Sequence, residues 1–242
     1  MACGDYVPCP FCREGTMLYG NPACGRCMEL MKIPSNDFGL GHVLKSPIVR
    51  HEPKPVRSVS KTLVVNLFAG PGTGKSTTCA GIFFDLKNLG INCEMACEYA
   101  KDLVWEKRDF TFENQIYLFA KQHHKIFRLL GQVDVVITDC PILLSPVYDG
   151  EKRATLEKLV VEEHEKTWNY NVFLKRKKAY NPIGRRHDEA HAHEVDVQVL
   201  NVLDRNHQCY ETFEASPEGK IAIVRKILLL LEHGPSTKGH VS

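Results

Sequence analysis

The sequence lacks any long uninterrupted run of apolar residues. Its longest such stretch, Ile227 to Leu231, is far shorter than the roughly 20 residues that a membrane-spanning helix needs. Residues 1–10 also lack the basic region and the apolar run of a secretory signal. We therefore expect a protein of the cytoplasm, or of the host cytoplasm if its source is viral, with no membrane partner.

Charge of one sign is not in excess either. The 31 Lys and Arg nearly balance the 29 Asp and Glu, and the net charge of +2 does not point to a polyanionic partner. Of the 242 residues, 43% are hydrophobic and 25% are charged, close to the average for soluble globular proteins. This length gives room for one α/β domain and a small appendage.

The composition divides the chain into four segments. Residues 1–33 are rich in Cys and Gly, and residues 34–60 contain four prolines among basic residues, which is typical of an extended linker. From 61 to 234, strand-like and helix-like patterns alternate, and residues 235–242 resemble a disordered tail. The alternation predicts an α/β fold of three layers, with a parallel sheet between helices.

The expected elements follow from the apolar patterns of this main segment. Strands are predicted over 62–68, 92–98, 133–138, 171–174 and 210–214, and helices over 75–88, 113–130, 151–166, 191–205 and 218–231. The helix over 113–130 is amphipathic. Its apolar face, which we expect to be buried, contains Ile116, Phe119, Ala120, Ile126, Phe127 and Leu130.

A glycine-rich segment joins the first predicted strand to the first predicted helix. It reads Ala69-Gly70-Pro71-Gly72-Thr73-Gly74-Lys75-Ser76. It matches the phosphate-binding loop of P-loop proteins except that the first Gly is Ala69, whose single methyl we expect to fit. Glycines let backbone N–H groups converge on phosphate oxygens, and the start of a helix adds partial positive charge. The segment predicts a site for ATP or GTP.

The loop also predicts which side chains hold the nucleotide and its magnesium ion. Lys75 is expected to reach the β- and γ-phosphates, Ser76 to ligate Mg²⁺, and Thr77 to reach the α-phosphate. Ligands of open α/β sheets bind at the carboxyl ends of the strands. Asp139 follows the strand over 133–138, so we expect it to hold Mg²⁺ through water, whereas Asp134 should lie at the opposite end.

With these motifs, residues 61–231 resemble the P-loop nucleoside and nucleotide kinases, most nearly the deoxynucleoside-kinase-like members. In that family a strand-end Glu followed by an aromatic-containing helix serves the acceptor hydroxyl. Glu98 and Trp105 stand in that place, although Tyr99 replaces the family's Pro. Gln115 is similar to a family amide that reads the edge of a nucleobase.

The end of the third strand departs from that pattern. It reads Thr138-Asp139-Cys140 in place of Glu-Arg-Ser, and a strand-end Asp is similar to kinases of the ribosylnicotinamide type. Either resemblance implies transfer of the γ-phosphate of ATP to a hydroxyl of a nucleoside, nucleotide or related small acceptor. Glu98 is then expected to be the general base, and Asp139 is the alternative.

Kinases of this group also carry a mobile, Arg-rich segment after the fourth strand, and the basic residues over 175–186 occupy that position. The resemblance implies that Arg176 and Arg185 stabilise the charge that develops on the transferred phosphoryl oxygens. A solvated basic loop is the alternative interpretation of the same residues.

Four cysteines of the first segment form two Cys-x-x-Cys pairs separated by eleven residues. Thiolates at this spacing suit tetrahedral Zn²⁺ and leave no open coordination position, so a structural zinc ribbon is expected. The predicted ligands are Cys9, Cys12, Cys24 and Cys27.

Two other functions are compatible with these motifs. The first is a kinase that acts on a hydroxymethylated base within DNA, held by the zinc ribbon and the basic linker; this chain resembles the P-loop kinases of phages that hypermodify thymine. The second is an ATPase adaptor whose nucleotide cycle controls partner binding. A GTPase switch is disfavoured, because the guanine-specificity motif Asn/Thr-Lys-x-Asp is absent.

Overall fold

The computed structural model describes residues 6–8, 16–18, 61–177 and 189–235. The strands β1 (Tyr6–Pro8) and β2 (Thr16–Leu18) form an antiparallel pair. The four cysteines predicted to bind zinc and Arg185 lie outside the described residues.

The main body is built on five parallel strands, as the sequence predicts. They are β3 (Leu63–Phe68), β4 (Cys93–Ala96), β5 (Val135–Thr138), β6 (Trp168–Lys175) and β7 (Glu211–Glu214). Their order in the sheet is β4-β5-β3-β6-β7, and each neighbouring pair is parallel. β6 begins earlier than predicted because it pairs with β3 along that strand's whole length, from Trp168 opposite Leu63 onward.

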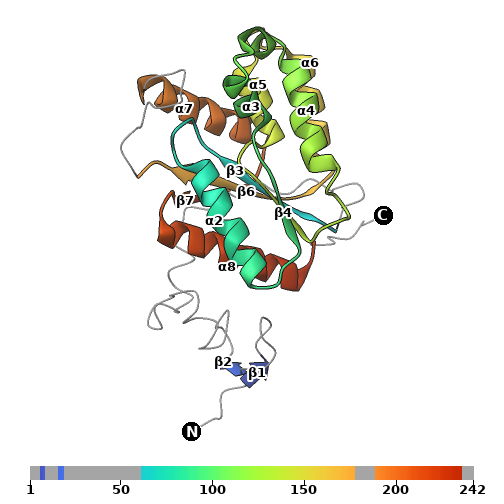
Figure 1. Ribbon diagram of the computed structural model, residues 1–242, viewed down its shortest axis with the longest axis vertical. Helices are drawn as coiled ribbons and strands as arrows, with labels where there is room; N and C mark the ends of the chain where they lie inside the picture. The colour runs from blue at the N-terminus through green and yellow to red at the C-terminus, as the bar shows by residue number, and fades with distance from the viewer. Residues whose placement is uncertain (1–5, 9–15, 19–60, 178–188, 236–242) are drawn as a thin grey trace.

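Helices cover both faces of this sheet (Figure 1). One face carries α2 (Lys75–Asn88) and α8 (Pro217–His233), which contact each other. The opposite face carries α4 (Gln115–Phe127), η3 (Ile142–Leu144), α5 (Ser145–Tyr148), α6 (Ala154–Glu165) and α7 (Glu189–Arg205). The short helices α3 (Tyr99–Trp105) and η2 (Asp109–Glu113) contact one another, and α3 packs on α4. None of the helices in the described ranges is long and apolar enough to cross a membrane.

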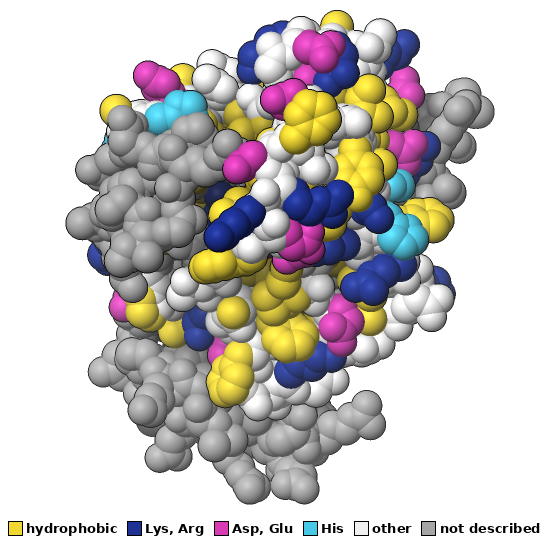
Figure 2. All heavy atoms as spheres, turned by 45° about the horizontal axis from the view of Figure 1, so that its top comes forward, with side chains coloured by type: hydrophobic (Ala, Val, Ile, Leu, Met, Phe, Trp, Pro, Cys, Tyr) yellow, Lys and Arg dark blue, Asp and Glu magenta, His cyan; other side chains and the backbone are white. Residues whose placement is uncertain are grey.

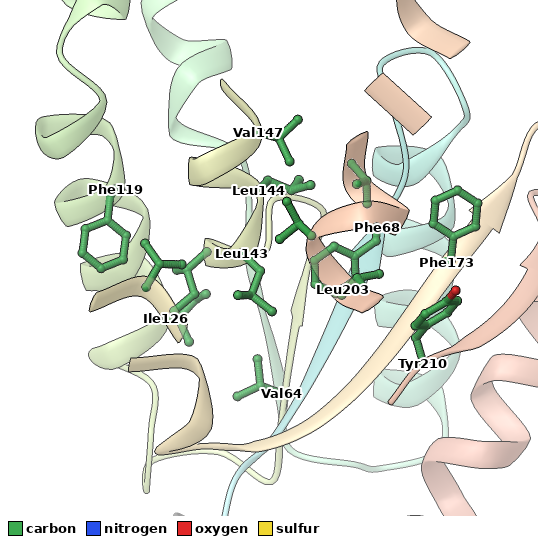
Figure 3. Packing of buried hydrophobic residues seen from close by; sticks show 14 of the residues in the cluster. Val64, Phe68, Phe119, Ile126, Leu143, Leu144, Val147, Phe173, Leu203 and Tyr210 are labelled. Carbon is green, nitrogen blue, oxygen red and sulfur yellow. The ribbon is translucent and has the colours of Figure 1, made fainter. Parts of the chain in front are cut away.

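The strand β3 explains why its sequence is apolar at almost every position. Val64 and Phe68 pack into the core beneath α4 to α7 (Figure 3), whereas Leu63, Val65 and Leu67 pack beneath α2 and α8. Successive side chains of a strand point to opposite faces, and a central parallel strand is buried on both. The continuous apolar run therefore reflects two cores, one on each face of the sheet.

The buried face of α4 differs from the predicted one. Ile116 and Phe127 are 53% and 60% exposed, while Phe119 and Ile126 are buried as expected. The buried face is completed by two glutamines, Gln115 and Gln122. An apolar pattern does not predict that glutamines face the core. Here both glutamine amides make hydrogen bonds, which offset the cost of burying them.

The order of the strands places a crevice beside β3. The connection that leaves β3 runs toward the β4 edge of the sheet. The connection that leaves β5 runs in the opposite direction, past β3 to β6. Crossovers between parallel strands are right-handed, so connections that run in opposite directions put their helices on opposite faces. α2 and α6 accordingly lie on opposite faces, and the carboxyl ends of β3 and β5 open between them, where α/β proteins bind ligands.

Candidate active site

The glycine-rich segment forms the turn between β3 and α2, as expected from its sequence. Gly72 and Gly74 have φ values of 82° and 111°, in the left-handed region that favours glycine. Gly74 is the N-cap of α2, and no side chain in the described ranges caps this end by a hydrogen bond. The first N–H groups of α2 therefore point into the loop, where they can donate to an anion.

Lys75, the first residue of α2, folds back over the loop. Its Nζ donates hydrogen bonds to the carbonyl oxygens of Ala69, at 2.7 Å, and Gly70, at 2.9 Å. Burial lowers the pKa of Lys75, and the nearby acids Glu98 and Asp139 oppose that shift. Burial is thus the larger effect, and the pKa of Lys75 stays below its ordinary value despite the neighbouring acids.

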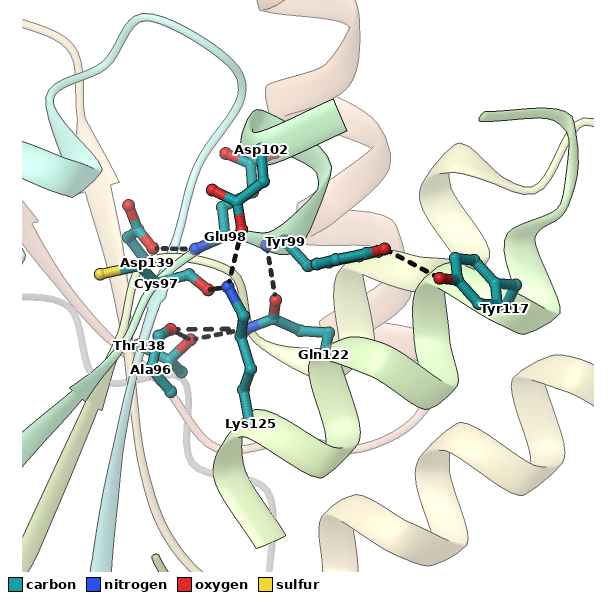
Figure 4. A network of polar contacts seen from close by, with 10 residues as sticks. All are labelled: Ala96, Cys97, Glu98, Tyr99, Asp102, Tyr117, Gln122, Lys125, Thr138 and Asp139. Carbon is teal, nitrogen blue, oxygen red and sulfur yellow. Dashed lines mark hydrogen bonds and ion pairs between the residues drawn. The ribbon is translucent and has the colours of Figure 1, made fainter. Parts of the chain in front are cut away.

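Two acidic residues meet Lys75 from the ends of neighbouring strands. Glu98 follows β4 and Asp139 follows β5, and the register pairs Ala96 with Thr138 just before them. The backbone N–H of Glu98 donates to Asp139 Oδ1 at 3.0 Å (Figure 4). Burial raises the pKa of Glu98, and the Asp139 carboxylate raises it further, while Lys75 lowers it.

A buried amide holds the turn that carries Glu98. Gln122 of α4 accepts a hydrogen bond from the backbone N–H of Tyr99 at 3.0 Å (Figure 4). Its Nε2 donates to the carbonyl of Ala96 and to Thr138 Oγ1, each at 3.4 Å. One side chain therefore ties α4 to the ends of both β4 and β5, and it fixes the direction in which Glu98 leaves the sheet.

The loop and Glu98 open onto one cavity of about 850 Å³. At one end it is lined by residues of the loop and of α2: Pro71, Gly72, Gly74, Lys75, Ser76 and Thr77. At the other end, the lining is mostly apolar and aromatic with a few polar groups: Tyr99, Ala100, Lys101, Val104, Phe112, Gln115, Leu118, Gln122, Leu144, Ser145 and Tyr148.

Glu98 and Cys140 lie between these two ends. Both interact electrostatically with Lys75 on one side and with Tyr148 on the other. Burial raises the pKa of Cys140 well above its usual value, so its thiol stays neutral. Tyr148 also lines the cavity, and although the residue is 41% exposed, partial burial raises the pKa of its hydroxyl. Glu98 is thus an acid that lines the same cavity as the glycine-rich loop and the apolar chamber.

The remaining predicted residues lie in different surroundings. Gln115 lines the cavity, and its Nε2 donates to the carbonyl of Phe112 at 3.3 Å. Trp105 is 74% exposed and does not line this cavity, so its contact with an acceptor stays a prediction. Arg176, just after β6, reaches the loop, and its Nη2 donates to the carbonyl of Pro71 at 3.1 Å.

The structure adds residues that the sequence did not single out. Asp196 of α7 accepts a hydrogen bond of 2.5 Å from the backbone N–H of Gly70. Gln122 and Tyr148 also join the site. No local sequence pattern marks Asp196 among the many polar residues of α7, and only the packing of that helix on the loop reveals it.

The donors around Lys75 suit a magnesium ion better than a softer metal. The hydroxyl of Ser76 and the carboxylate of Asp139 are hard oxygen donors, of the kind that Mg²⁺ prefers. In the described ranges, no cluster of three or more His, Cys, Asp or Glu side chains is arranged to hold a metal by itself. Mg²⁺ usually binds through one or two protein ligands together with phosphate oxygens.

No family model matches the sequence, and no curated protein matches it. Among solved structures, a shikimate kinase from Bacteroides thetaiotaomicron is 15% identical with a TM-score of 0.40, over 70% of this chain and 98% of that one. A deoxyadenosine kinase from M. mycoides, with the products dCMP and a flexible dCDP bound, is 16% identical with a TM-score of 0.41, over 70% and 97%. Likenesses this distant assign no activity.

Proposed function

We propose that the chain is an ATP-dependent phosphotransferase, which transfers the γ-phosphate to a hydroxyl of a nucleoside, a nucleotide or a related small acceptor. One observation carries the proposal. The glycine-rich loop, the acid Glu98 and a mostly apolar chamber open onto the same cavity, and Glu98 interacts electrostatically with Lys75 of the loop and with Tyr148 of the chamber. This is the arrangement that direct transfer between two bound molecules requires.

The loop end of the cavity is proposed to bind the nucleotide. The backbone amides over 72–74 would receive the phosphate oxygens, Lys75 would reach the β- and γ-phosphates, and Thr77 the α-phosphate. Ser76 and Asp139 would hold Mg²⁺, which supplies charge neutralisation between the phosphates when bound. Lys75 would then exchange its contacts with the loop carbonyls for contacts with phosphate oxygens.

The chamber end is proposed to bind the acceptor. Pockets for small ligands are mostly apolar, with a few polar groups that fix the orientation of the ligand. Here the Phe112 ring and the Leu118 side chain offer apolar contact, and the Gln115 amide offers a donor and an acceptor suited to the edge of a nucleobase. A nucleoside seated there would direct its hydroxyl toward Glu98.

Glu98 is proposed to be the general base. A carboxylate with a raised pKa accepts a proton more readily than an ordinary one, and its position between Lys75 and Tyr148 brings it to an acceptor hydroxyl. Asp139 is the alternative base, but its Oδ1 already accepts the amide of Glu98. Arg176, and Arg185 outside the described residues, are proposed to stabilise the charge on the transferred phosphoryl oxygens.

The zinc ribbon over 1–33, with Cys9, Cys12, Cys24 and Cys27 as ligands, remains a separate proposal. So does contact of this segment with DNA. On the face that Figure 2 shows, the basic and acidic side chains of the described residues are interspersed. The described residues on that face thus offer no continuous basic patch for a polymer, and we favour a small acceptor.

A transfer screen separates the three functions. The protein is incubated with Mg²⁺ and ATP labelled at the γ-phosphate, together with nucleosides, nucleotides, DNA that contains 5-hydroxymethyluracil, or buffer alone. Labelled nucleoside or nucleotide is the expected product. Label on DNA alone would favour the DNA kinase, and release of phosphate without label on any acceptor would favour the ATPase adaptor.

Matched lysine variants tie the result to this site. Lys75→Ala is expected to abolish transfer, whereas Lys87→Ala, which removes an exposed lysine from the other end of α2, is expected to leave it intact. Full transfer by Lys75→Ala would contradict the assignment of the loop.

A further inference from the structure

Asp196 connects two parts of the site that are far apart in the sequence. One carboxylate oxygen, Oδ1, accepts the backbone N–H of Gly70 in the phosphate-binding loop at 2.5 Å. The other, Oδ2, accepts a hydrogen bond from Nη2 of Arg176 at 3.3 Å. The Asp196 side chain is only 17% exposed, so both contacts are made with little competition from water.

The same guanidinium group also contacts the loop directly. Arg176 Nη2 donates to the carbonyl of Pro71 at 3.1 Å, and Pro71 lines the end of the cavity that would hold the phosphates. The carboxylate of Asp196 is also among the charges that act on Lys75. Asp196 thus pairs with Arg176 and also acts electrostatically on Lys75.

The loop is shaped to let α7 come this close. A Cβ atom at Gly70 would overlap the carbonyl oxygen of Ala192 and would lie 2.9 Å from Asp196 Oδ1. A glycine at position 70 is therefore required by the packing of α7, in addition to any requirement of the phosphates. The contact between helix and loop is a built feature of the fold and involves backbone on both sides.

We propose that Asp196 is a positioning residue, which holds the guanidinium of Arg176 against the phosphate-binding loop so that it meets the terminal phosphate of ATP. The proposal rests on the function proposed above. An arginine side chain has many rotamers, and fixing it before the nucleotide binds removes an entropic cost from phosphate recognition. Because ADP lacks the γ-phosphate, the effect of Asp196 should appear mainly in the binding of ATP.

The variant Asp196→Asn separates this role from simple packing. The amide has nearly the same shape, and its oxygen can still accept the N–H of Gly70, but its NH₂ group cannot accept a hydrogen bond from Arg176. The same change removes Coulomb repulsion between the Asp196 carboxylate and the phosphates of ATP. By itself, that loss of repulsion would strengthen the binding of ATP. Weaker binding of ATP would therefore identify the positioning role, because general electrostatics predicts the opposite change.

The test is calorimetric titration of the full chain with Mg·ATP and with Mg·ADP. For Asp196→Asn we expect an affinity for ATP that is lower by on the order of 10-fold or more, the size expected for a charge-assisted hydrogen bond to phosphate, and little change for ADP. Arg176→Gln should give the same pattern, and the double variant should bind ATP no more weakly than Arg176→Gln alone.

Two controls lie on the same helix. Glu194→Gln removes the charge of a side chain that is 69% exposed, and His193→Gln removes an imidazole whose Nδ1 lies 4.0 Å from Asp196 Oδ2. Both should bind ATP and ADP like the wild type. If Asp196→Asn does not fold, Asp196→Glu and Asp196→Gln repeat the comparison of charged and neutral side chains, and Glu is expected to retain more of the preference for ATP.

An unchanged ratio of ATP to ADP affinity in Asp196→Asn would overturn this inference. So would a double variant that binds ATP more weakly than Arg176→Gln by the full factor lost in Asp196→Asn. In either case, uptake of Mg·ATP by the wild type would leave the proposed function standing. Wild-type protein that takes up neither nucleotide would overturn the proposed function, and this inference with it.

Discussion

The backbone N–H of Glu98 donates a 3.0 Å hydrogen bond to Oδ1 of Asp139, and this contact joins the ends of two neighbouring strands. It gives the two acids different surroundings. Asp139 accepts a backbone N–H, whereas burial raises the pKa of Glu98. Two carboxylates held in unlike environments are suited to different roles, one for the metal and one for the proton.

Glu98→Gln is expected to lower transfer to the acceptor by about 10² to 10⁴-fold, the usual contribution of a general base. Only the ionised carboxylate can accept a proton, so transfer by the wild type should fall as the pH drops through the raised pKa of Glu98. This decline should begin at a higher pH than for a glutamate of ordinary pKa. Rates measured from pH 5 to 9 test the profile.

The control for Glu98 is Glu94→Gln, which changes an exposed acid of β4 that pairs with Lys87. Its pH profile should match that of the wild type. If Glu98→Gln transferred phosphate at the wild-type rate, Asp139 would become the candidate base.

Asp139→Asn is expected to raise the concentration of Mg²⁺ needed for nucleotide uptake by about 10-fold or more, because a neutral amide is a poorer ligand for a hard cation. The amide oxygen can still accept the N–H of Glu98, so the turn at the end of β4 should persist. The measurement is nucleotide uptake during a titration with Mg²⁺. The control is Asp134→Asn, which lies just before the start of the same strand and should show the wild-type dependence on Mg²⁺. If Asp139→Asn also showed the wild-type dependence, Asp139 would not be a ligand of the metal.

The buried imidazole of His164 is expected to make the free energy of unfolding depend on pH. The side chain is 2% exposed, and burial lowers its pKa from 6.5 to about 3. Below pH 6.5 the imidazole takes up a proton in the unfolded chain but not in the folded one, so stability is lost as the pH falls toward 3. The expected loss from this group between neutral pH and pH 5 is about 2 kcal/mol.

Urea unfolding at pH 7, 6 and 5 measures this loss. In His164→Phe the contribution should disappear, leaving a smaller dependence on pH than in the wild type. His124→Phe, which changes an exposed histidine of α4, should keep the wild-type dependence. Equal slopes for wild type and His164→Phe would show that His164 is not buried in its neutral form.

If residues 1–33 form the proposed zinc ribbon, protein purified without chelator should contain about one Zn²⁺ per chain, because four thiolates bind a single ion. Cys9→Ser should lower that content, and Cys209→Ser, which changes an exposed cysteine of the main body, should not. Elemental analysis gives both values. A wild-type content well below one ion per chain would contradict the ribbon.

The parts of the fold that the sequence predicted are those with strong local patterns. β3 and the loop after it are recognisable because a strand buried on two faces must be apolar throughout and because the loop needs glycines. Asp139 could be placed at the ligand-binding edge because the direction of a parallel strand fixes which end carries the site.

The parts that it missed depend on contacts between distant segments. The face of α4 was misplaced because Gln122 is buried by its bonds to the ends of β4 and β5, which no helical pattern records. Asp196 belongs to the site only because α7 packs on Gly70, 126 residues earlier in the chain. The helices η3 and α5 were not predicted, because three and four residues are too few to show a period.

The central claim is that the turn around Lys75 binds a nucleoside triphosphate with magnesium. Calorimetric titration of wild-type protein and of Lys75→Ala with Mg·ATP tests it most directly, with Lys87→Ala as the matched control. We predict saturable uptake of about one ATP per chain by the wild type and the control, and uptake weakened by on the order of 100-fold or more in Lys75→Ala. The absence of uptake by the wild type, or equal affinity in Lys75→Ala, would contradict the claim.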